Sequence, residues 1–225
     1  MKRFYLLAVI LAALFLSFNY AGKAQSTTNH QSEINKQPQG FFDKFHWLNS
    51  SDHQVHEIHF VGGYSFHSTR GFWGKIPRAD LQVYGLRYNR KLFNISDRYI
   101  LEYVAEVNLS VDYELNPTQY DYGTGQFSGF GGTPLGFQFN FRKDEFIQPF
   151  FKTSTGFMLF NKQFPDDRGT KFNFTLELGA GTEFALSDDV SFTLGYKYHH
   201  MSNFFIGQIN PGVDSNIFYT GITIF

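Results

Sequence analysis

The chain has 225 residues, a formal net charge of −1, 20% aromatic residues and no cysteine. Nucleic-acid binding needs clustered Lys and Arg, so a balanced charge without a basic run argues against a nucleic-acid partner. The absence of cysteine excludes disulfide scaffolds, thiolate metal sites and cysteine nucleophiles.

Residues 1–24 have the three parts of a secretory signal peptide. Lys2 and Arg3 give a positive start, residues 4–18 are almost all apolar, and Gly22 and Ala24 are small residues at the expected cleavage site. The apolar stretch is shorter than the roughly 20 residues of a transmembrane helix. The sequence therefore predicts removal of residues 1–24 and export of the mature chain.

Residues 25–55 are polar and rich in Gln, Asn, Ser and Thr, with one short aromatic segment at 41–47. Such composition is typical of a flexible lead segment. We expect the folded domain to span residues 56–225, and the role of the lead segment stays open.

From His56 onward, apolar and polar residues alternate with a period of two, as in strands with two unlike faces. One apolar series is Leu101, Tyr103, Ala105, Val107, Leu109, Val111 and Tyr113, and another is Phe172, Phe174, Leu176, Leu178, Ala180, Thr182 and Phe184. Similar patterns occur near residues 58–66, 84–88, 135–141, 151–159, 192–198 and 217–225. The sequence thus predicts eight strands.

The length of these runs separates a membrane barrel from a soluble sandwich. Several runs reach ten residues or more, whereas strands of soluble sheets average about 5 to 6 and membrane-spanning strands need about 9 to 11. Aromatic residues gather at strand ends, as interface girdles require; examples are Tyr99, Tyr113, Tyr196, Tyr198 and Phe225. We therefore predict an all-β fold, an eight-stranded antiparallel transmembrane β-barrel in the outer membrane.

The predicted connections alternate in length along the chain. The long ones are 68–79, 114–132, 161–170 and 203–214, and the short ones are 92–97, 143–147 and 187–189. Short periplasmic turns and long outer loops produce this alternation. Residues 199–216 are therefore expected at the outer surface.

Charged residues recur on the polar face of the predicted strands. Since an eight-stranded barrel is just wide enough for side chains to fill it, they are expected to form an interior salt-bridge network. The acids are Glu57, Glu102, Glu106, Glu177 and Glu183, and the bases are Arg87, Arg142, Lys152 and Lys197.

Three residues near the end of the chain have the types and spacing of a Ser-His-Asp triad. His200 and Ser202 continue the lipid-facing side of their strand, where residues i and i+2 are neighbours. Asp214 opens the next strand after the turn 210–212 and can orient the imidazole of His200. The competing interpretation is that a strand simply ends there, among polar residues. His199 lies on the opposite side and is expected to be structural.

A second group of histidines, His53, His56 and His59, has the spacing of metal ligands. His56 and His59 fall on opposite faces of a strand, so a zinc site is not expected. The esterase chemistry of Ser, His and Asp needs neither metal nor cofactor.

The segment 198–203, Tyr-His-His-Met-Ser-Asn, is followed by Asn-Pro-Gly-Val-Asp at 210–214. This His-x-Ser-Asn motif, with an acid fourteen residues after the His, resembles the lipid A 3-O-deacylase (PagL-like) family of outer-membrane barrels. The signal peptide and the eight strands extend the resemblance loosely over the mature chain.

The resemblance implies a serine esterase that removes the acyl chain ester-linked at the 3-position of lipid A, in the outer leaflet of the lipopolysaccharide-bearing membrane. It implies Ser202 as nucleophile, His200 as general base, Asp214 as orienting acid and Asn203 near the oxyanion. Two features depart from the family: its acid is typically Glu, and the segment 204–206 is bulkier here.

Other functions remain open from the residues alone. A non-enzymatic small barrel would serve adhesion or lipid binding, and an acyltransferase barrel would pass the acyl chain to an acceptor instead of water. The sequence also leaves open the preferred acyl-chain length and the choice between monomer and homodimer.

Overall fold

A computed structural model describes residues 56–96, 98–142 and 145–225. The predicted signal peptide and the lead segment lie outside the described residues. Within the described part of the chain, no helix is long and apolar enough to cross a membrane.

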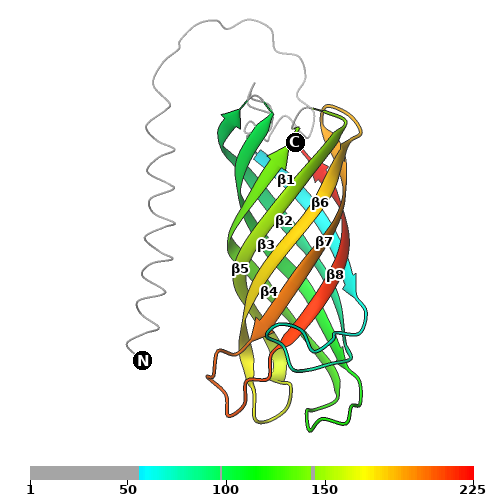
Figure 1. The fold of residues 1–225 in the computed structure, drawn as a ribbon, viewed down its shortest axis with the longest axis vertical. Helices are drawn as coiled ribbons and strands as arrows, with labels where there is room; N and C mark the ends of the chain where they lie inside the picture. Colours follow the sequence, from blue (N-terminus) through cyan, green and yellow to red (C-terminus); the bar gives the residue numbers. More distant parts are fainter. Residues whose placement is uncertain (1–55, 97, 143–144) are drawn as a thin grey trace, which may run out of the picture. The chain divides into compact units, whose positions relative to one another are not determined.

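The described residues form one closed antiparallel barrel of eight strands, in which each strand pairs with its sequence neighbour and β1 also pairs with β8 (Figure 1). This confirms the predicted fold class. The strands are β1 (His56–Ser65), β2 (Ala79–Ser96), β3 (Tyr99–Leu115), β4 (Gly125–Phe141), β5 (Ile147–Phe164), β6 (Thr170–Ala185), β7 (Val190–Ser202) and β8 (Val213–Ile224).

The connections alternate as predicted. The β1–β2, β3–β4, β5–β6 and β7–β8 loops lie together at one end of the barrel, and the short turns lie at the other end with the C-terminus (Figure 1). Two loops are shorter than predicted, because β4 begins at Gly125 and β5 continues to Phe164. A side chain at Gly129 or Gly131 would come within 2.4 Å of a β5 carbonyl oxygen. These two glycines of β4 therefore permit close packing of β4 against β5.

The two faces of most strands are those that the alternation predicts. In β6, for example, Asn173, Thr175 and Glu177 are buried inside the barrel and the residues between them lie outside. The outer part of β3 is different. Ser110 pairs with Tyr84 and Asn108 with the next residue of β2, so Leu109 forms a β-bulge. The extra residue reverses the alternation, and Val111 and Tyr113, predicted to face lipid, are buried inside.

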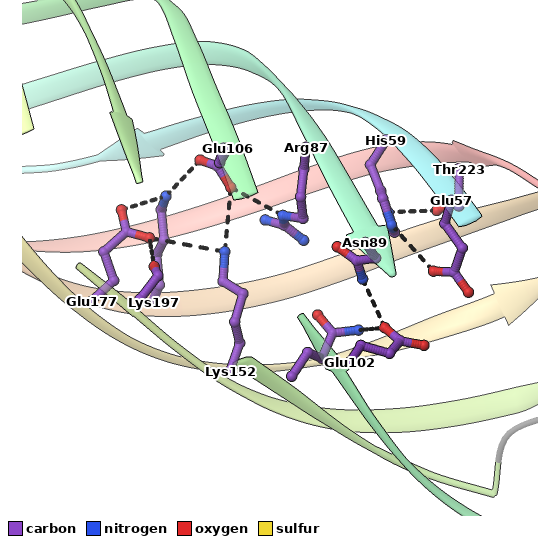
Figure 2. Close-up of polar contacts among 12 residues, drawn as sticks. Glu57, His59, Arg87, Asn89, Glu102, Glu106, Lys152, Glu177, Lys197 and Thr223 are labelled. Carbon is purple, nitrogen blue, oxygen red and sulfur yellow. Dashed lines mark hydrogen bonds and ion pairs between the residues drawn. The ribbon is translucent and has the colours of Figure 1, made fainter. Parts of the chain in front are cut away.

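The inner half of the barrel, toward the short turns, holds a charged network (Figure 2). Glu106 accepts hydrogen bonds from Arg87 (3.0 Å), Lys152 (3.3 Å) and Lys197 (3.2 Å), and Lys197 also donates to Glu177 at 2.8 Å. All five side chains are buried, so each charge is compensated by partners rather than by water. The predicted salt-bridge network is confirmed for these residues.

The other predicted members have different partners. Glu102 accepts hydrogen bonds from Asn89 and Gln138, and Glu183 accepts one from Ser191. Arg142 was predicted inside but lies in an exposed turn and pairs with Glu145, because β4 ends at Phe141.

The alternation predicts a polar interior, but the outer half of the barrel interior is apolar. Aliphatic and aromatic side chains fill it; the main ones are Ile76, Leu81, Val83, Val111, Tyr113, Leu115, Phe127, Met158, Phe160, Phe164, Met201, Val213 and Ile217. The candidate active site lies on the exterior surface of the barrel at this same end.

Candidate active site

The outer end of β7 presents two polar side chains on the barrel exterior. Its burial alternates strictly from Tyr196 to Ser202, with Lys197, His199 and Met201 buried inside. His200 and Ser202 therefore lie outside, as the sequence predicts.

His200 and Asp214 are direct partners across β7 and β8. The Nδ1 atom of His200 lies 2.6 Å from Oδ1 of Asp214. The turn before β8 allows this approach, since Gly212 has a φ of 60° and a Cβ there would lie 3.0 Å from His200 Cε1. The structure thus brings together the predicted base and the predicted acid.

The carboxylate of Asp214 is only 2% exposed, although it points out of the barrel. The β1–β2 loop covers it: the backbone N–H of Trp73 donates to Oδ2 at 3.1 Å. The Trp73 ring also packs against His200, with ring centroids 5.4 Å apart and an edge-on orientation. No pattern in the sequence predicts this contact.

Ser202 lies beside apolar residues of β6. It pairs with Phe174, and His200 pairs with Leu176. A small pocket borders Ser202 and is lined by Phe164, Pro165, Asn173, Met201, Asn203, Asn210, Pro211 and Gly212. In the described part of the chain, no hydrogen bond joins the Ser202 hydroxyl to His200.

Asn203 is buried and organises the β7–β8 loop. Its side-chain Nδ2 donates to the carbonyl of Ile209 at 2.7 Å, and its backbone N–H donates to Oδ1 of Asn210 at 2.9 Å. The next two residues, Phe204 and Phe205, have φ values of 51° and 61°, a left-handed conformation that is costly for bulky residues. Asn203 thus helps to hold a constrained loop next to Ser202.

Two members of the predicted histidine group, His56 and His59, have separate partners, and the third, His53, lies outside the described residues. His56 bonds the Tyr88 hydroxyl, while His59 is buried beside Thr223 and Glu57. Among residues 56–96, 98–142 and 145–225, no group of three or more His, Cys, Asp or Glu side chains is arranged to hold a metal ion.

Comparison with solved structures reveals similar barrels. The crystal structure of the outer membrane enzyme PagL is 17% identical, with a TM-score of 0.57, over 72% of this chain and 97% of that chain. Ail of Yersinia pestis is 13% identical with a TM-score of 0.44, over 76% of this chain and 97% of that one. No curated protein matches the sequence significantly.

A family model gives a more specific match. The model for lipid A 3-O-deacylase (PagL) matches residues 82–223, which is more than half of the chain and includes His200, Ser202 and Asp214. The chain therefore belongs to the lipid A 3-O-deacylase (PagL) family, and it is an outer-membrane β-barrel of an ester hydrolase family.

Proposed function

We propose that this protein hydrolyses the ester-linked 3-O acyl chain of lipid A, with Ser202, His200 and Asp214 as a catalytic triad. One observation carries the proposal: the 2.6 Å contact between His200 and Asp214 lies on the barrel exterior, two residues from Ser202 on the same face. Nucleophile, base and orienting acid are thus available at a surface that lipid can reach.

The His200–Asp214 contact determines which ring nitrogen acts as the base. Nδ1 donates its hydrogen to Asp214, so the lone pair of Nε2 is free to accept a proton. Ser202 lies two residues from His200 on the exterior face of β7, and a side-chain rotation can bring its Oγ toward Nε2. Catalytic hydrogen bonds are often loose before substrate binds.

The reaction proceeds in two halves. Ser202 Oγ attacks the ester carbonyl while its proton passes to His200 Nε2, and that proton then goes to the departing sugar oxygen. A water molecule next gives a proton to His200 and attacks the acyl-enzyme carbonyl. The bond between the acyl carbon and Ser202 Oγ then breaks, His200 returns the proton to Oγ, and the fatty acid is released. Asp214 stabilises the charged imidazole in both halves, and no metal or cofactor is required.

Asn203 is proposed to support the oxyanion. One Nδ2 hydrogen is used by the Ile209 carbonyl, and an amide nitrogen carries a second hydrogen. Since Asn203 lines the pocket beside Ser202, this second hydrogen is the candidate donor to the oxyanion.

The surroundings of Ser202 suit a substrate that stays in the bilayer. On one side lie the apolar side chains of β6, including Phe174 and Leu176. Phe72 and Phe205 are 90% and 82% exposed at the same end of the barrel. A membrane-embedded acyl chain can lie against these residues while its ester group meets Ser202 at the polar boundary.

Mass spectrometry of lipid A from cells with and without the protein tests the proposal. We expect loss of one ester-linked acyl chain and release of the matching free fatty acid, and neither product with Ser202→Ala. Gel mobility before and after heating shows whether the variant barrel is folded. Transfer of the chain to another lipid would indicate an acyltransferase, and unchanged lipid A with the parent protein would indicate a non-enzymatic barrel.

A further inference from the structure

We propose that the Gly71–Gly74 segment of the β1–β2 loop is a positioning element of the active site, which holds Asp214 and His200 in the geometry that the reaction needs. This inference rests on the proposed function. The segment lies outside residues 82–223, which the family model matches, and it acts through Asp214 and His200 rather than on the substrate.

The first support is the fixation of Asp214. A carboxylate can rotate about its last bond, which would tilt both oxygens out of line with His200. Here Oδ2 accepts the Trp73 N–H at 3.1 Å while Oδ1 lies 2.6 Å from His200 Nδ1. The loop thus supplies a hydrogen bond that holds the plane of the carboxylate in place.

The second support is the absence of free space between the loop and the acid. A Cβ at Gly71 would lie 2.3 Å from Asp214 Oδ2, and a Cβ at Gly74 would lie 2.5 Å from the Asp214 backbone nitrogen. No side chain fits at either position without displacing the loop or the carboxylate. The two glycines therefore allow the backbone to close over Asp214.

The third support is the anchoring of the segment to the turn that precedes β8. The backbone N–H of Lys75 donates to the carbonyl of Pro211 at 2.8 Å, and that of Ile76 donates to the carbonyl of Gly212 at 3.2 Å. The loop is therefore bound to the chain directly before Asp214, so its position is transmitted to the acid.

The Trp73 ring restricts the base from the other side. Its centroid lies 5.4 Å from that of His200 and 6.1 Å from that of Tyr198. An indole edge against the imidazole limits rotation of the ring about its side-chain bonds. Trp73 thus contacts both members of the pair, the acid through its backbone and the base through its ring.

The decisive variants are Gly74→Ala and Trp73→Ala, measured in detergent or lipid on purified full-length protein. Because a displacement of about 1 Å can cost roughly a hundredfold in rate, we expect kcat to fall about 10- to 100-fold in each, with KM within about twofold of the parent. Trp73→Phe should restore most of the rate lost in Trp73→Ala, since it keeps an aromatic edge against His200.

The matched control is Gly123→Ala in the β3–β4 loop. Its Cβ would lie 2.2 Å from the Pro165 carbonyl oxygen, so it disturbs outer-loop packing equally, but its nearest atoms belong to the β5–β6 loop and not to Asp214. We expect kcat within about twofold of the parent. A comparable loss of kcat in Gly123→Ala would mean that loop packing in general, and not this segment, supports activity.

A spectroscopic signal separates positioning from general damage. The proton in a short imidazole–carboxylate hydrogen bond resonates downfield of the backbone amides in an NMR spectrum. This downfield proton signal should weaken in Gly74→Ala and persist in Gly123→Ala. If folded Gly74→Ala and Trp73→Ala keep the parent kcat and this signal, the inference is wrong. Activity that survives His200→Ala would instead overturn the proposed triad itself.

Discussion

His199 and His200 are neighbours in the sequence, and each bonds a carboxylate through Nδ1. His199 lies inside the barrel, 3.0 Å from Glu177, and is fully buried. His200 lies outside, 2.6 Å from Asp214, with 16% of its side chain exposed. One pair belongs to the interior network and the other borders a serine and the lipid.

The partners of the two acids support our proposal of a catalytic role for the His200–Asp214 pair. Glu177 also bonds Lys197 and Ser154, so its charge is shared within a closed interior network (Figure 2). In the described part of the chain, Asp214 forms its ion pair with His200, and the backbone N–H of Trp73 holds its second oxygen. The same two residue types thus stabilise a fold on one face and can serve a reaction on the other.

Removal of the exterior base should have the largest effect. We expect His200→Ala to lower deacylation by about 10⁴- to 10⁶-fold, since the proton of Ser202 loses its acceptor. The barrel should still fold, because His200 lies on the exterior face of β7 and outside the packed interior, and gel mobility before and after heating checks this. His199→Gln is the interior counterpart and should retain activity when folded. Equal losses in both variants would contradict the division between the two histidines.

Substitution of the exterior acid should have the next largest effect. Asp214→Asn keeps the shape but removes the charge and can select the wrong imidazole tautomer, which costs about 10⁴-fold in serine proteases. Asp214→Glu keeps the charge but adds a methylene where the loop leaves no free space, so its loss of activity should be smaller than that of Asp214→Asn. Release of fatty acid from lipid A measures both. Parent-like rates in Asp214→Asn would leave a Ser202–His200 dyad as the catalytic unit.

The interior network should respond in stability instead. Glu106→Gln leaves Arg87, Lys152 and Lys197 without a shared counter-charge in a buried site, which typically costs about 3 to 5 kcal/mol. Urea unfolding in detergent measures this loss. At low urea, where the variant is folded, its deacylation rate should stay near that of the parent. A much lower rate under these conditions would show that the interior network affects the exterior site.

The smallest effect concerns the outer loops. Hydrogen bonds from Arg168 hold the pKa of Asp166 below its ordinary value. Because this pKa is lower in the folded state, the ionised Asp166 stabilises the loop at pH values above its unfolded-state pKa. The stabilisation is lost as the pH falls through the folded-state pKa. Partly exposed pairs contribute about 0.2 to 1 kcal/mol. Protease cleavage at 116–124 and 165–169 should therefore rise modestly at low pH, and Asp166→Asn should remove that pH dependence.

Much of the fold could be predicted because strands alternate strictly between lipid and interior. The prediction failed where a local insertion breaks the period, as at Leu109, whose bulge turns Val111 and Tyr113 inward. It also failed at Arg142, because the alternation does not reveal where a strand ends. It also placed residues 125–132 in a loop, although they belong to β4, where Gly129 and Gly131 allow the neighbouring strand to approach closely.

The candidate site was predictable only where its members are local. His200 and Ser202 share a strand face, and a tight turn brings Asp214 back beside His200. Trp73 lies 141 residues before Asp214, and no period or spacing in the sequence connects them. The one available signal was an aromatic pair between two glycines at 71–74, which suggests close backbone packing without naming its partner.

The apolar filling of the outer half of the barrel has a consequence for permeability. Leu81, Phe127, Met158 and Phe164 are among the side chains that pack together there, and an ion would have to leave water to pass them, at a cost of several kcal/mol or more. The barrel therefore offers ions no conducting path from one side of the membrane to the other. A cell can carry many copies of this protein in its outer membrane without weakening that membrane as a barrier to solutes.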